Sequence, residues 1–437
     1  MRLRAKWQKT VAKWGRSYRK RRLKLARWLV QRRWVREAIV VPAISDHSVP
    51  LVGSPVGVAS QPQAVHAAEA RVLPFDTALS LKPGLCIVGY LRSEIGLGQA
   101  ARCLAYAADA VRLPSSFHHL PLPMRENEPE FTTKCIPLPD RKANLLVFGL
   151  PSITALYGEI GGGRHNILYP FWELHGIERE WLDLAGRCAE VWAPSTFVAD
   201  AFRAQSKLPV TLVRQPVQFP KAGLTGARPA GPLSFLTYFD YDSFGARKNP
   251  KATVTAFRTA FPLGSEDVKL IVKTRGADDN GLRGWLAGEC AAEPRLEVID
   301  RTVDRETMDR LVADCDVFVS LHRSEGFGFG AAEALAAAKA VIATDYSGTT
   351  DFINQTTGYP IAYKLIPVLK GQYLATTGQV WADADLEDAA AAMRAVYDQP
   401  DQARRRAEHG RAHLLAAFSP GVIGAQMRDL LAARGLL

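Results

Sequence analysis

The chain has 437 residues, of which 47% are hydrophobic, and its 55 Lys and Arg against 44 Asp and Glu give a formal net charge of +11. Residues 1–40 hold fifteen of the basic residues and one acid, so they carry +14. The remainder, with 40 basic and 43 acidic residues, carries −3. This charge excludes a general polyanion-binding surface on residues 41–437. The length favours two domains, and no apolar run approaches the roughly 20 residues that a membrane-spanning helix needs.

The first 40 residues are predicted to form a basic amphipathic helix. Arg and Lys occupy most of its circumference, and the remaining apolar side chains share one narrow face. That face consists of Leu3, Trp7, Val11, Trp14, Tyr18, Leu25 and Leu29. Because indole rings favour the membrane–water boundary and cationic side chains favour anionic lipid, we expect residues 1–36 to bind an anionic membrane surface. This predicts a cytoplasmic protein that is peripheral on the inner face of the membrane.

Three other interpretations of this segment stay open. The helix packs on the protein's own globular domain, or it is a solvated basic tail that touches nucleic acid, or it is an Arg-rich, acid-poor transit peptide. No signal peptide is predicted, because the first 36 residues never form an uninterrupted apolar stretch. We expect no specific nucleic-acid partner.

Beyond the basic segment, the pattern predicts a linker and two domains. Residues 41–80 are rich in Pro, Ser, Val and Ala without a clear period and are predicted to be the linker. The first domain is predicted over 81–228 and the second over 229–410. The strand-like runs of the first domain are 85–91, 143–149, 166–169, 190–192 and 210–213, with a helix over 99–110. Those of the second domain are 233–239, 268–273, 296–299, 316–321 and 340–343.

Alternation of strands and helices predicts parallel sheets with helices on both faces. The fold class is therefore α/β, with two Rossmann-like domains that face a cleft. In such sheets ligands bind at the carboxyl ends of the strands. The end of the chain, about 401 to 433, is predicted to form two helices, and residues 411–437 are assigned to the C-terminal helix.

A glycine loop follows the first predicted strand. Gly96 and Gly98 lie in Gly-Leu-Gly-Gln-Ala-Ala, which matches the G-x-G-x-x-A fingerprint of dinucleotide-binding proteins. The acid expected about 20 residues later is not clearly placed, and four residues separate the glycines from the strand. A nicotinamide site is therefore the less favoured interpretation of this loop.

Polar side chains follow two further strands of the first domain. Glu173 and His175 come after the run at 166–169, so we expect them at a carboxyl end, facing the cleft, where either can orient a substrate or accept a proton. His118 and His119 follow Phe117 and are weaker candidates for the same cleft. A lone histidine in a fold is more often structural than catalytic.

The stretch 324–334, Ser-Glu-Gly-Phe-Gly-Phe-Gly-Ala-Ala-Glu-Ala, carries the strongest signal in the chain. It lies between a strand-like run and a helix-like run, so Gly326, Phe327 and Gly328 form a glycine loop before a helix N-terminus, an arrangement that suits phosphate. Glu325 stands before the loop and Glu333 is placed in the first helical turn. Because carboxylates accept hydrogen bonds from sugar hydroxyls, the pattern favours a nucleotide that carries a sugar. The alternative is an ordinary turn with two incidental glutamates.

The spacing of Glu325 and Glu333 resembles the E-x7-E motif of retaining glycosyltransferases with the GT-B fold, the large family often numbered four. The segment 240–250, Asp-Tyr-Asp-Ser-Phe-Gly-Ala-Arg-Lys-Asn-Pro, resembles the phosphate-gripping loop of that family. The segment 343–352, Ala-Thr-Asp-Tyr-Ser-Gly-Thr-Thr-Asp-Phe, is similar to a further stretch of its members. The resemblance covers about 84 to 400, and the relatives that look most similar act in bacterial surface polysaccharide assembly.

This resemblance implies roles for the candidate residues. Arg247 and Lys248 would hold the donor's diphosphate, with Lys273 joining them, because preorganised cations stabilise a departing diphosphate. The loop of Gly96 and Gly98 would face the donor across the cleft, and the last helix would cross back to the first domain. Many relatives carry an arginine five residues before the loop lysine, where this chain has Ser243, so the residue that replaces it is open.

The predicted function is the transfer of a sugar from a GDP- or UDP-linked donor to a glycan or lipid-linked oligosaccharide acceptor, with retention at the anomeric carbon. Glu325, Glu173 and His175 are the catalytic candidates, and the nucleotide-sugar is a co-substrate. Two rivals stay open, namely a nucleotide-sugar epimerase of the same architecture and a non-catalytic scaffold that uses its basic helix to recruit partners. Whether Glu173 acts as a nucleophile, or attack occurs on the face that the leaving group departs, is open as well.

Neither an obligatory metal nor a disulfide is predicted. Asp-x-Asp occurs at 240/242, 314/316 and 383/385, which shows how common the pattern is, and no His/Cys cluster with metal-ligand spacing is visible. The six cysteines lack C-x-x-C pairs, and several lie in apolar runs, so we expect buried free thiols in a reducing compartment.

Overall fold

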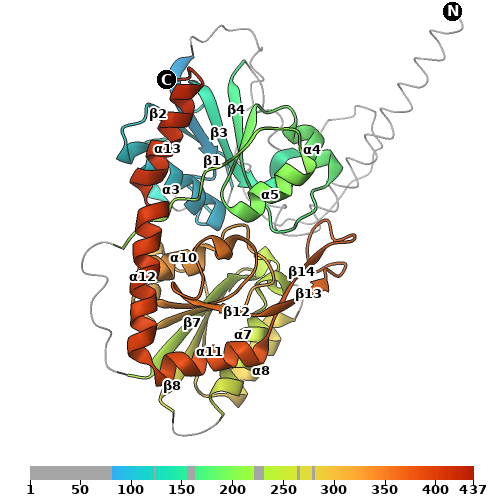
Figure 1. The fold of residues 1–437 in the computed structure, drawn as a ribbon, viewed down its shortest axis with the longest axis vertical. Helices are drawn as coiled ribbons and strands as arrows, with labels where there is room; N and C mark the ends of the chain where they lie inside the picture. The colour runs from blue at the N-terminus through green and yellow to red at the C-terminus, as the bar shows by residue number, and fades with distance from the viewer. Residues whose placement is uncertain are drawn as a thin grey trace, which may run out of the picture. The chain divides into compact units, whose positions relative to one another are not determined.

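The computed structural model describes residues 81–122, 125–126, 128–154, 163–220, 231–262, 266–277 and 281–437, and Leu81–Leu437 form one compact unit. The predicted basic helix over 1–40 and the linker over 41–80 lie outside these residues. The described chain forms two six-stranded parallel sheets and a two-stranded antiparallel sheet, with helices against them (Figure 1). The predicted α/β class with two Rossmann-like domains is confirmed.

The first domain is built on a parallel sheet in the order β2-β1-β3-β4-β5-β6. Its strands are β1 (Lys82–Gly89), β2 (Ser115–His119), β3 (Arg141–Gly149), β4 (His165–Phe171), β5 (Glu190–Ala193) and β6 (Val210–Leu212). Its helices are α3 (Gly96–Ala110), α4 (Arg179–Ala185) and α5 (Thr196–Gln205), with short 3-10 turns at Pro129–Phe131 and Leu150–Thr154. Successive strand side chains point to opposite faces, so Ile87 packs in a cluster with α3 while Val88 packs in one with α5.

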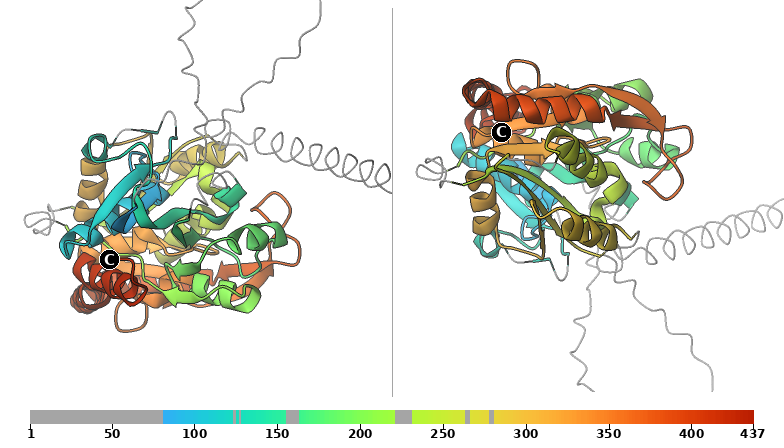
Figure 2. Two further views of the ribbon diagram at one scale, coloured as in Figure 1. Left: turned by 90° about the horizontal axis from the view of Figure 1, so that it is seen from above. Right: turned by 90° about the horizontal axis from the view of Figure 1, so that it is seen from below.

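The second domain repeats this plan in the order β12-β11-β10-β7-β8-β9. Its strands are β7 (Leu233–Asp240), β8 (Val268–Arg275), β9 (Leu296–Asp300), β10 (Val317–Ser320), β11 (Ala340–Thr344) and β12 (Tyr359–Ile361). Its helices are α6 (Gly245–Lys248), α7 (Pro250–Ala260), α8 (Leu282–Ala292), α9 (Arg305–Asp314), α10 (Phe329–Ala336) and α11 (Leu386–Asp398), with 3-10 turns at Tyr241–Ser243 and Ser347–Asp351. Phe235 packs in a cluster with α7, whereas Leu236 packs in one with α10, so helices lie on both faces (Figure 2).

An antiparallel hairpin and two long helices complete the second half of the chain. The hairpin strands are β13 (Tyr363–Pro367) and β14 (Val380–Ala384). The chain ends in α12 (Pro400–Phe418) and α13 (Pro420–Ala433), which confirms two helices near 401–433. Pro420 occupies the first position of α13, where its missing N–H costs no hydrogen bond.

The final helix lies against the first domain, while α12 packs on α10 and β11 of the second (Figure 1). Gln426 of α13 donates to the carbonyl oxygen of Leu212 at 2.8 Å. Gly424 meets α3 so closely that a Cβ there would lie 2.0 Å from the carbonyl oxygen of Ala107. Glycine is therefore required at this crossing.

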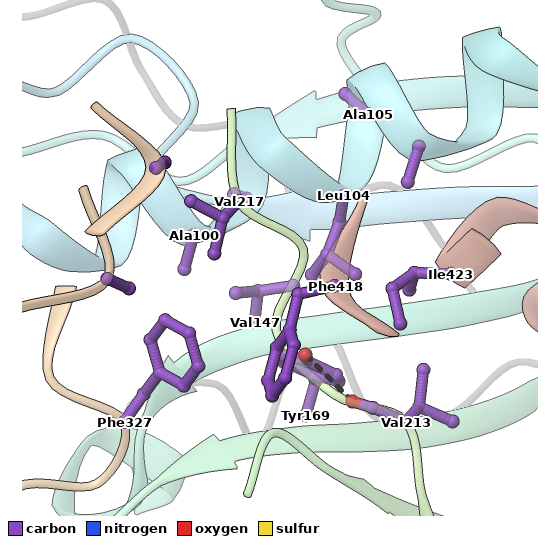
Figure 3. Packing of buried hydrophobic residues seen from close by; sticks show 14 of the residues in the cluster. Ala100, Leu104, Ala105, Val147, Tyr169, Val213, Val217, Phe327, Phe418 and Ile423 are labelled. Atoms are coloured by element: carbon purple, nitrogen blue, oxygen red, sulfur yellow. Dashed lines mark hydrogen bonds between the residues drawn. The ribbon is translucent and has the colours of Figure 1, made fainter. Parts of the chain in front are cut away.

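One buried cluster is shared by both domains. It contains Leu104 of α3 and Tyr169 of β4 together with Phe327, which precedes α10, and Phe418, which ends α12 (Figure 3). The Tyr169 hydroxyl donates to the carbonyl oxygen of Val213 at 3.0 Å, so its polar end is satisfied inside the cluster. The two halves are thus joined by continuous apolar packing.

The predicted strands are present, with ends that differ by a few residues, and four further strands were not predicted. β2 has the sequence Ser-Ser-Phe-His-His and lacks an apolar run, yet its register against β1 places it in the sheet. β12 has only three residues, and β13 is largely exposed. Among the helices of the described residues, none is both long enough and apolar enough to cross a membrane.

Candidate active site

The glycine loop between β10 and α10 lies at the carboxyl end of the second sheet. Gly328 precedes the helix with φ +94°, and a Cβ there would lie 2.4 Å from Thr349 Cγ2, so both backbone shape and space require glycine. The helix begins at Phe329, two residues before Ala331, where the helix-like run in the sequence begins. Glu333 is therefore its fifth residue and lies in the second turn, which corrects its expected place in the first.

Glu325 lies at the centre of an ion-pair cluster with Arg247 and Lys248. Arg247 Nη1 is 3.0 Å from Glu325 Oε2, and Lys248 Nζ pairs with Glu325 Oε1. Although burial opposes its ionisation most strongly, Lys248 and Arg247 lower the pKa of Glu325 to about 2. Burial lowers the pKa of Lys248, an effect that Arg247 adds to and Glu325 opposes. The cluster therefore pairs one carboxylate with two basic side chains.

Local backbone geometry holds these cations in place. α6 is a single turn between Phe244 and Asn249, which both adopt left-handed conformations with φ of 63° and 51°. A left-handed phenylalanine is uncommon and is held here by surrounding contacts. Arg247 is 6% exposed, and its Nη1 also donates to the carbonyl oxygen of Ser324 at 2.9 Å. The loop after β7 and the glycine loop are therefore tied together through one guanidinium.

Glu333 has two partners that the sequence did not single out. Tyr238 on β7 donates its hydroxyl to Glu333 Oε2 at 2.9 Å, and Arg305 Nη1 lies 2.8 Å from Glu333 Oε1. Burial raises the pKa of Tyr238 well above its usual value, and the charge of Glu333 raises it further. The phenol therefore stays protonated and donates a hydrogen bond. Tyr238 lies near the carboxyl end of a predicted strand, and this position could have identified it as a candidate site residue. No feature of the sequence identifies Arg305 in this way.

Glu173 joins the cluster from the first domain, and His175 does not. Glu173 Oε1 is 4.0 Å from Arg247 Nη1, and Tyr373 donates its hydroxyl to Glu173 Oε2. His175 is exposed, and its ring packs against Phe197 at a centroid distance of 4.7 Å. The structure thus places one of the two residues beside Arg247. Tyr373, which lies between β13 and β14, was not identified from the sequence.

Lys273 is buried near the same sheet edge. It is 5% exposed, and its Nζ donates to the carbonyl oxygen of Thr274 at 3.3 Å. Burial, with a further contribution from nearby Arg275, lowers the pKa of Lys273 to about 8. Because little opposite charge compensates its buried ammonium, Lys273 is suited to bind an anion.

The loop of the first domain with Gly96 and Gly98 lies close to the second domain. Arg275 of β8 donates to the carbonyl oxygen of Glu94 in this loop. A Cβ on Gly98 would lie 2.1 Å from the carbonyl oxygen of Ser93, so this glycine is needed for the tight turn into α3, whereas nothing lies within 4 Å of one built on Gly96. The two glycines therefore differ, and only Gly96 leaves open space beside its backbone.

Other candidates are held by protein groups. His119 Nε2 lies 3.0 Å from Glu126, and His118 Nδ1 lies 3.1 Å from the carbonyl oxygen of Ile136. Phe327 is 1% exposed and its ring lies in the shared cluster, so only its backbone could face a ligand. A Cβ on Gly326 would lie 3.1 Å from the carbonyl oxygen of Trp172, which shows how closely the glycine loop approaches the first domain.

The three Asp-x-Asp pairs have protein partners. Asp242 Oδ2 accepts from Arg125 at 2.9 Å, Asp316 accepts from the backbone N–H of Ser234 at 2.7 Å, and Asp385 caps α11. Across the described residues, no group of three or more His, Cys, Asp or Glu side chains is arranged to hold a metal ion. All six cysteines are free, with four buried and two half-buried.

The second domain matches the sequence model of a family described as "Family 4 Glycosyltransferase in conflict systems", over residues 215–421. No curated protein sequence matches the chain. Solved structures resemble it at low identity. Alr3699/HepE of Anabaena, in complex with UDP and glucose, has 12% identity and a TM-score of 0.60, with 80% of this chain and 100% of that chain covered.

Two further structures show the same fold. Sucrose-phosphate synthase of Thermosynechococcus elongatus has 15% identity and a TM-score of 0.60, with 81% of this chain and 99% of that chain covered. TarM of S. aureus has 13% identity and a TM-score of 0.52, and the match covers 67% of this chain but only 56% of the TarM chain. The predicted GT-B arrangement of the two domains is confirmed by these likenesses.

Proposed function

We propose that this chain, an enzyme whose second domain is a glycosyltransferase domain, moves a sugar from a GDP- or UDP-linked donor to a glycan or lipid-linked oligosaccharide acceptor, with retention at the anomeric carbon. The observation that carries the proposal is the cluster of Arg247, Lys248 and Glu325 at the carboxyl end of the second sheet, with Glu173 of the first domain beside it. The Anabaena protein's complexes with UDP and glucose and with UDP-glucose support a nucleotide-sugar donor.

In the proposed reaction the bond between the anomeric carbon and the donor's diphosphate breaks, and its electron pair leaves with the diphosphate. The acceptor oxygen forms the new bond to that carbon and loses its proton to a base. Arg247 and Lys248 stabilise the charge that develops on the leaving diphosphate, because they are held in place before the reaction begins. Glu173 is our candidate for orienting the sugar or taking the acceptor's proton.

The remaining residues are assigned to the donor. Glu325 faces the sugar, and Glu333 accepts a hydrogen bond from a ribose hydroxyl while keeping Tyr238 and Arg305, since each carboxylate oxygen has a second lone pair. Lys273 and the backbone near Gly96 complete the anion-binding edge. His175 keeps only a supporting place in this proposal, because its ring packs against Phe197.

The test is calorimetry with UDP and GDP, followed by mass spectrometry of the purified protein with a panel of UDP- and GDP-sugars. The proposal predicts micromolar binding of one nucleoside diphosphate and transfer that needs an acceptor. Conversion of the donor to its sugar epimer without an acceptor, followed by NMR because the mass does not change, would identify an epimerase instead. Absence of binding to every nucleoside diphosphate would leave the scaffold interpretation.

We further propose that residues 1–36 attach the enzyme to the anionic, cytoplasmic face of a membrane, where polysaccharide is assembled on lipid-linked acceptors. The support is the charge of the sequence, because basic residues are attracted to anionic lipid by about 1 kcal/mol each at low salt. Full-length protein should co-sediment with anionic vesicles at low salt and be released as salt rises. Protein that begins at residue 81 should stay in solution and still turn over a soluble acceptor. Full-length protein that ignores anionic vesicles at low salt contradicts the proposal.

A further inference from the structure

The β13–β14 hairpin connects the second domain to the segment that follows β4 in the first. At its base, Ala382 of β14 donates its N–H to the carbonyl oxygen of Arg323, close to the glycine loop, at 3.0 Å. Beyond the strands, Gln379 Oε1 accepts from the N–H of Gly176 at 3.0 Å, and Tyr373 donates its hydroxyl to Glu173. The hairpin thus joins the glycine loop to the carboxylate that we place in the cleft.

Tyr373 is held rigidly by aromatic contacts. It is 8% exposed, and its ring lies 4.9 Å from that of Phe244 and 5.6 Å from that of Trp172, measured between centroids. The guanidinium of Arg247 lies 5.9 Å from the centre of the same ring. Burial, with a further contribution from Glu173, raises the pKa of Tyr373 well above its usual value. The hydroxyl therefore stays protonated and donates to the carboxylate.

The two oxygens of Glu173 have different partners. Oε2 accepts from Tyr373, whereas Oε1 stays 4.0 Å from Arg247, whose Nη1 is already 3.0 Å from Glu325. Without the hydroxyl, the Glu173 carboxylate is free to rotate and close on Arg247, which would place a second carboxylate against a cation that the diphosphate needs. The hydroxyl keeps one oxygen away from the guanidinium.

We propose that Tyr373 is a positioning residue for the transfer reaction, which orients Glu173 toward the bound sugar and acceptor and keeps it apart from Arg247. The inference rests on the proposed function, because it assigns Glu173 to that reaction. It adds a residue of the hairpin, outside both six-stranded sheets, to the residues that act on the bound sugar.

The experiment compares full-length Tyr373→Phe with the wild type, using the donor and acceptor found in the screen. A hydrogen bond to a charged group is worth about tenfold to a hundredfold in rate. We expect kcat to fall by that factor, while the dissociation constant of UDP or GDP stays within about twofold. The control is Tyr363→Phe, which removes a tyrosine hydroxyl from an exposed ring of the same hairpin. It should leave kcat and the dissociation constant unchanged.

A thermodynamic cycle isolates the contact itself. Melting temperatures of Tyr373→Phe, Glu173→Gln and the double variant should be non-additive, because both changes affect one hydrogen bond. Additive shifts, or a Tyr373→Phe enzyme with wild-type kcat, overturn the inference and leave the proposed function intact. A wild-type protein with no turnover on any nucleotide-sugar overturns the proposed function, and the role of Tyr373 falls with it.

Discussion

Ser195, which caps α5 in the first domain, donates a hydrogen bond of 2.6 Å from its Oγ to the carbonyl oxygen of Gly326 in the glycine loop of the second domain. The same Oγ accepts from the N–H of Val198 at 3.3 Å, so one hydroxyl ends a helix and holds a loop. Ser195 is fully buried. The shape of the glycine loop therefore depends on contact with the first domain.

Ser195→Ala should destabilise the protein and loosen the glycine loop. Loss of the cap costs about 0.5–2 kcal/mol, and the carbonyl oxygen of Gly326 loses a buried partner. We expect a lower melting temperature. We also expect the affinity for a nucleoside diphosphate, measured by calorimetry, to fall several-fold. The control is Ser206→Ala at the other end of α5, where the hydroxyl accepts from Leu208 within the same domain. If both variants affect binding equally, the contact with Gly326 has no special role.

Lys248→Ala should weaken nucleoside diphosphate binding by about tenfold to a hundredfold, the worth of a charge-assisted hydrogen bond. The removed ammonium pairs with Glu325 beside the glycine loop. The matched control is Lys251→Ala, because Lys251 lies three residues later on the exposed side of α7, over the ring of Trp285. Titration of UDP and GDP into both variants checks this. Equal affinity for the Lys248 variant and the wild type would remove Lys248 from the donor site.

Glu325→Gln should lower turnover without weakening nucleoside diphosphate binding. The change removes a negative charge from beside Arg247 and Lys248, so both cations attract the diphosphate at least as strongly as before. The sugar loses a charged acceptor, and we expect kcat to fall by about tenfold to a hundredfold. Calorimetry with the bare nucleotide, set beside a transfer assay, separates the two effects. Loss of nucleotide affinity with unchanged turnover would reverse our assignment of Glu325.

The same variant should also be less sensitive to acid. Glu325 has a pKa of about 2 in the folded protein, compared with 4.5 in the absence of such contacts. Its contribution to stability is therefore complete above pH 4.5 and is lost as the pH falls toward 2, since protons then bind preferentially to the unfolded chain. Melting temperatures of the wild type should fall more steeply over this range than those of Glu325→Gln. Parallel curves would contradict the ion-pair cluster.

Lys273→Met should stabilise the protein at neutral pH and weaken nucleotide binding. Because the pKa of Lys273 is lowered to about 8 from 10.5, the unfolded chain binds more protons between these values, and stability rises as the pH rises through them. Removing the ammonium lifts a penalty of at most roughly 3 kcal/mol at pH 7. The control is Lys269→Met on the same strand, whose ammonium reaches Glu297 at the surface. A lower melting temperature for Lys273→Met at pH 7 would contradict the assignment.

The sequence by itself determined the α/β class, the main strands of both sheets and the stretches that carry Glu325, Arg247, Lys248 and Glu173. These features are local, because period-two runs, glycine spacing and charge order are carried by neighbouring residues. It also placed the excess positive charge in residues 1–40. The short strands β2 and β12 were not predicted, since they have no apolar run that distinguishes them from loops.

Only the tertiary structure decided which side chains meet. Ser195 and Gly326 are 131 residues apart in the chain, and Glu173 and Tyr373 are 200 apart. Arg305 reaches Glu333 because α9 and α10 pack on the same sheet. Such pairs leave no periodic signal, because they arise where two sheets and a hairpin are packed together. The charge state of Glu325 and the burial of Lys273 follow from that packing as well, since desolvation and neighbouring charge exist only in the folded chain.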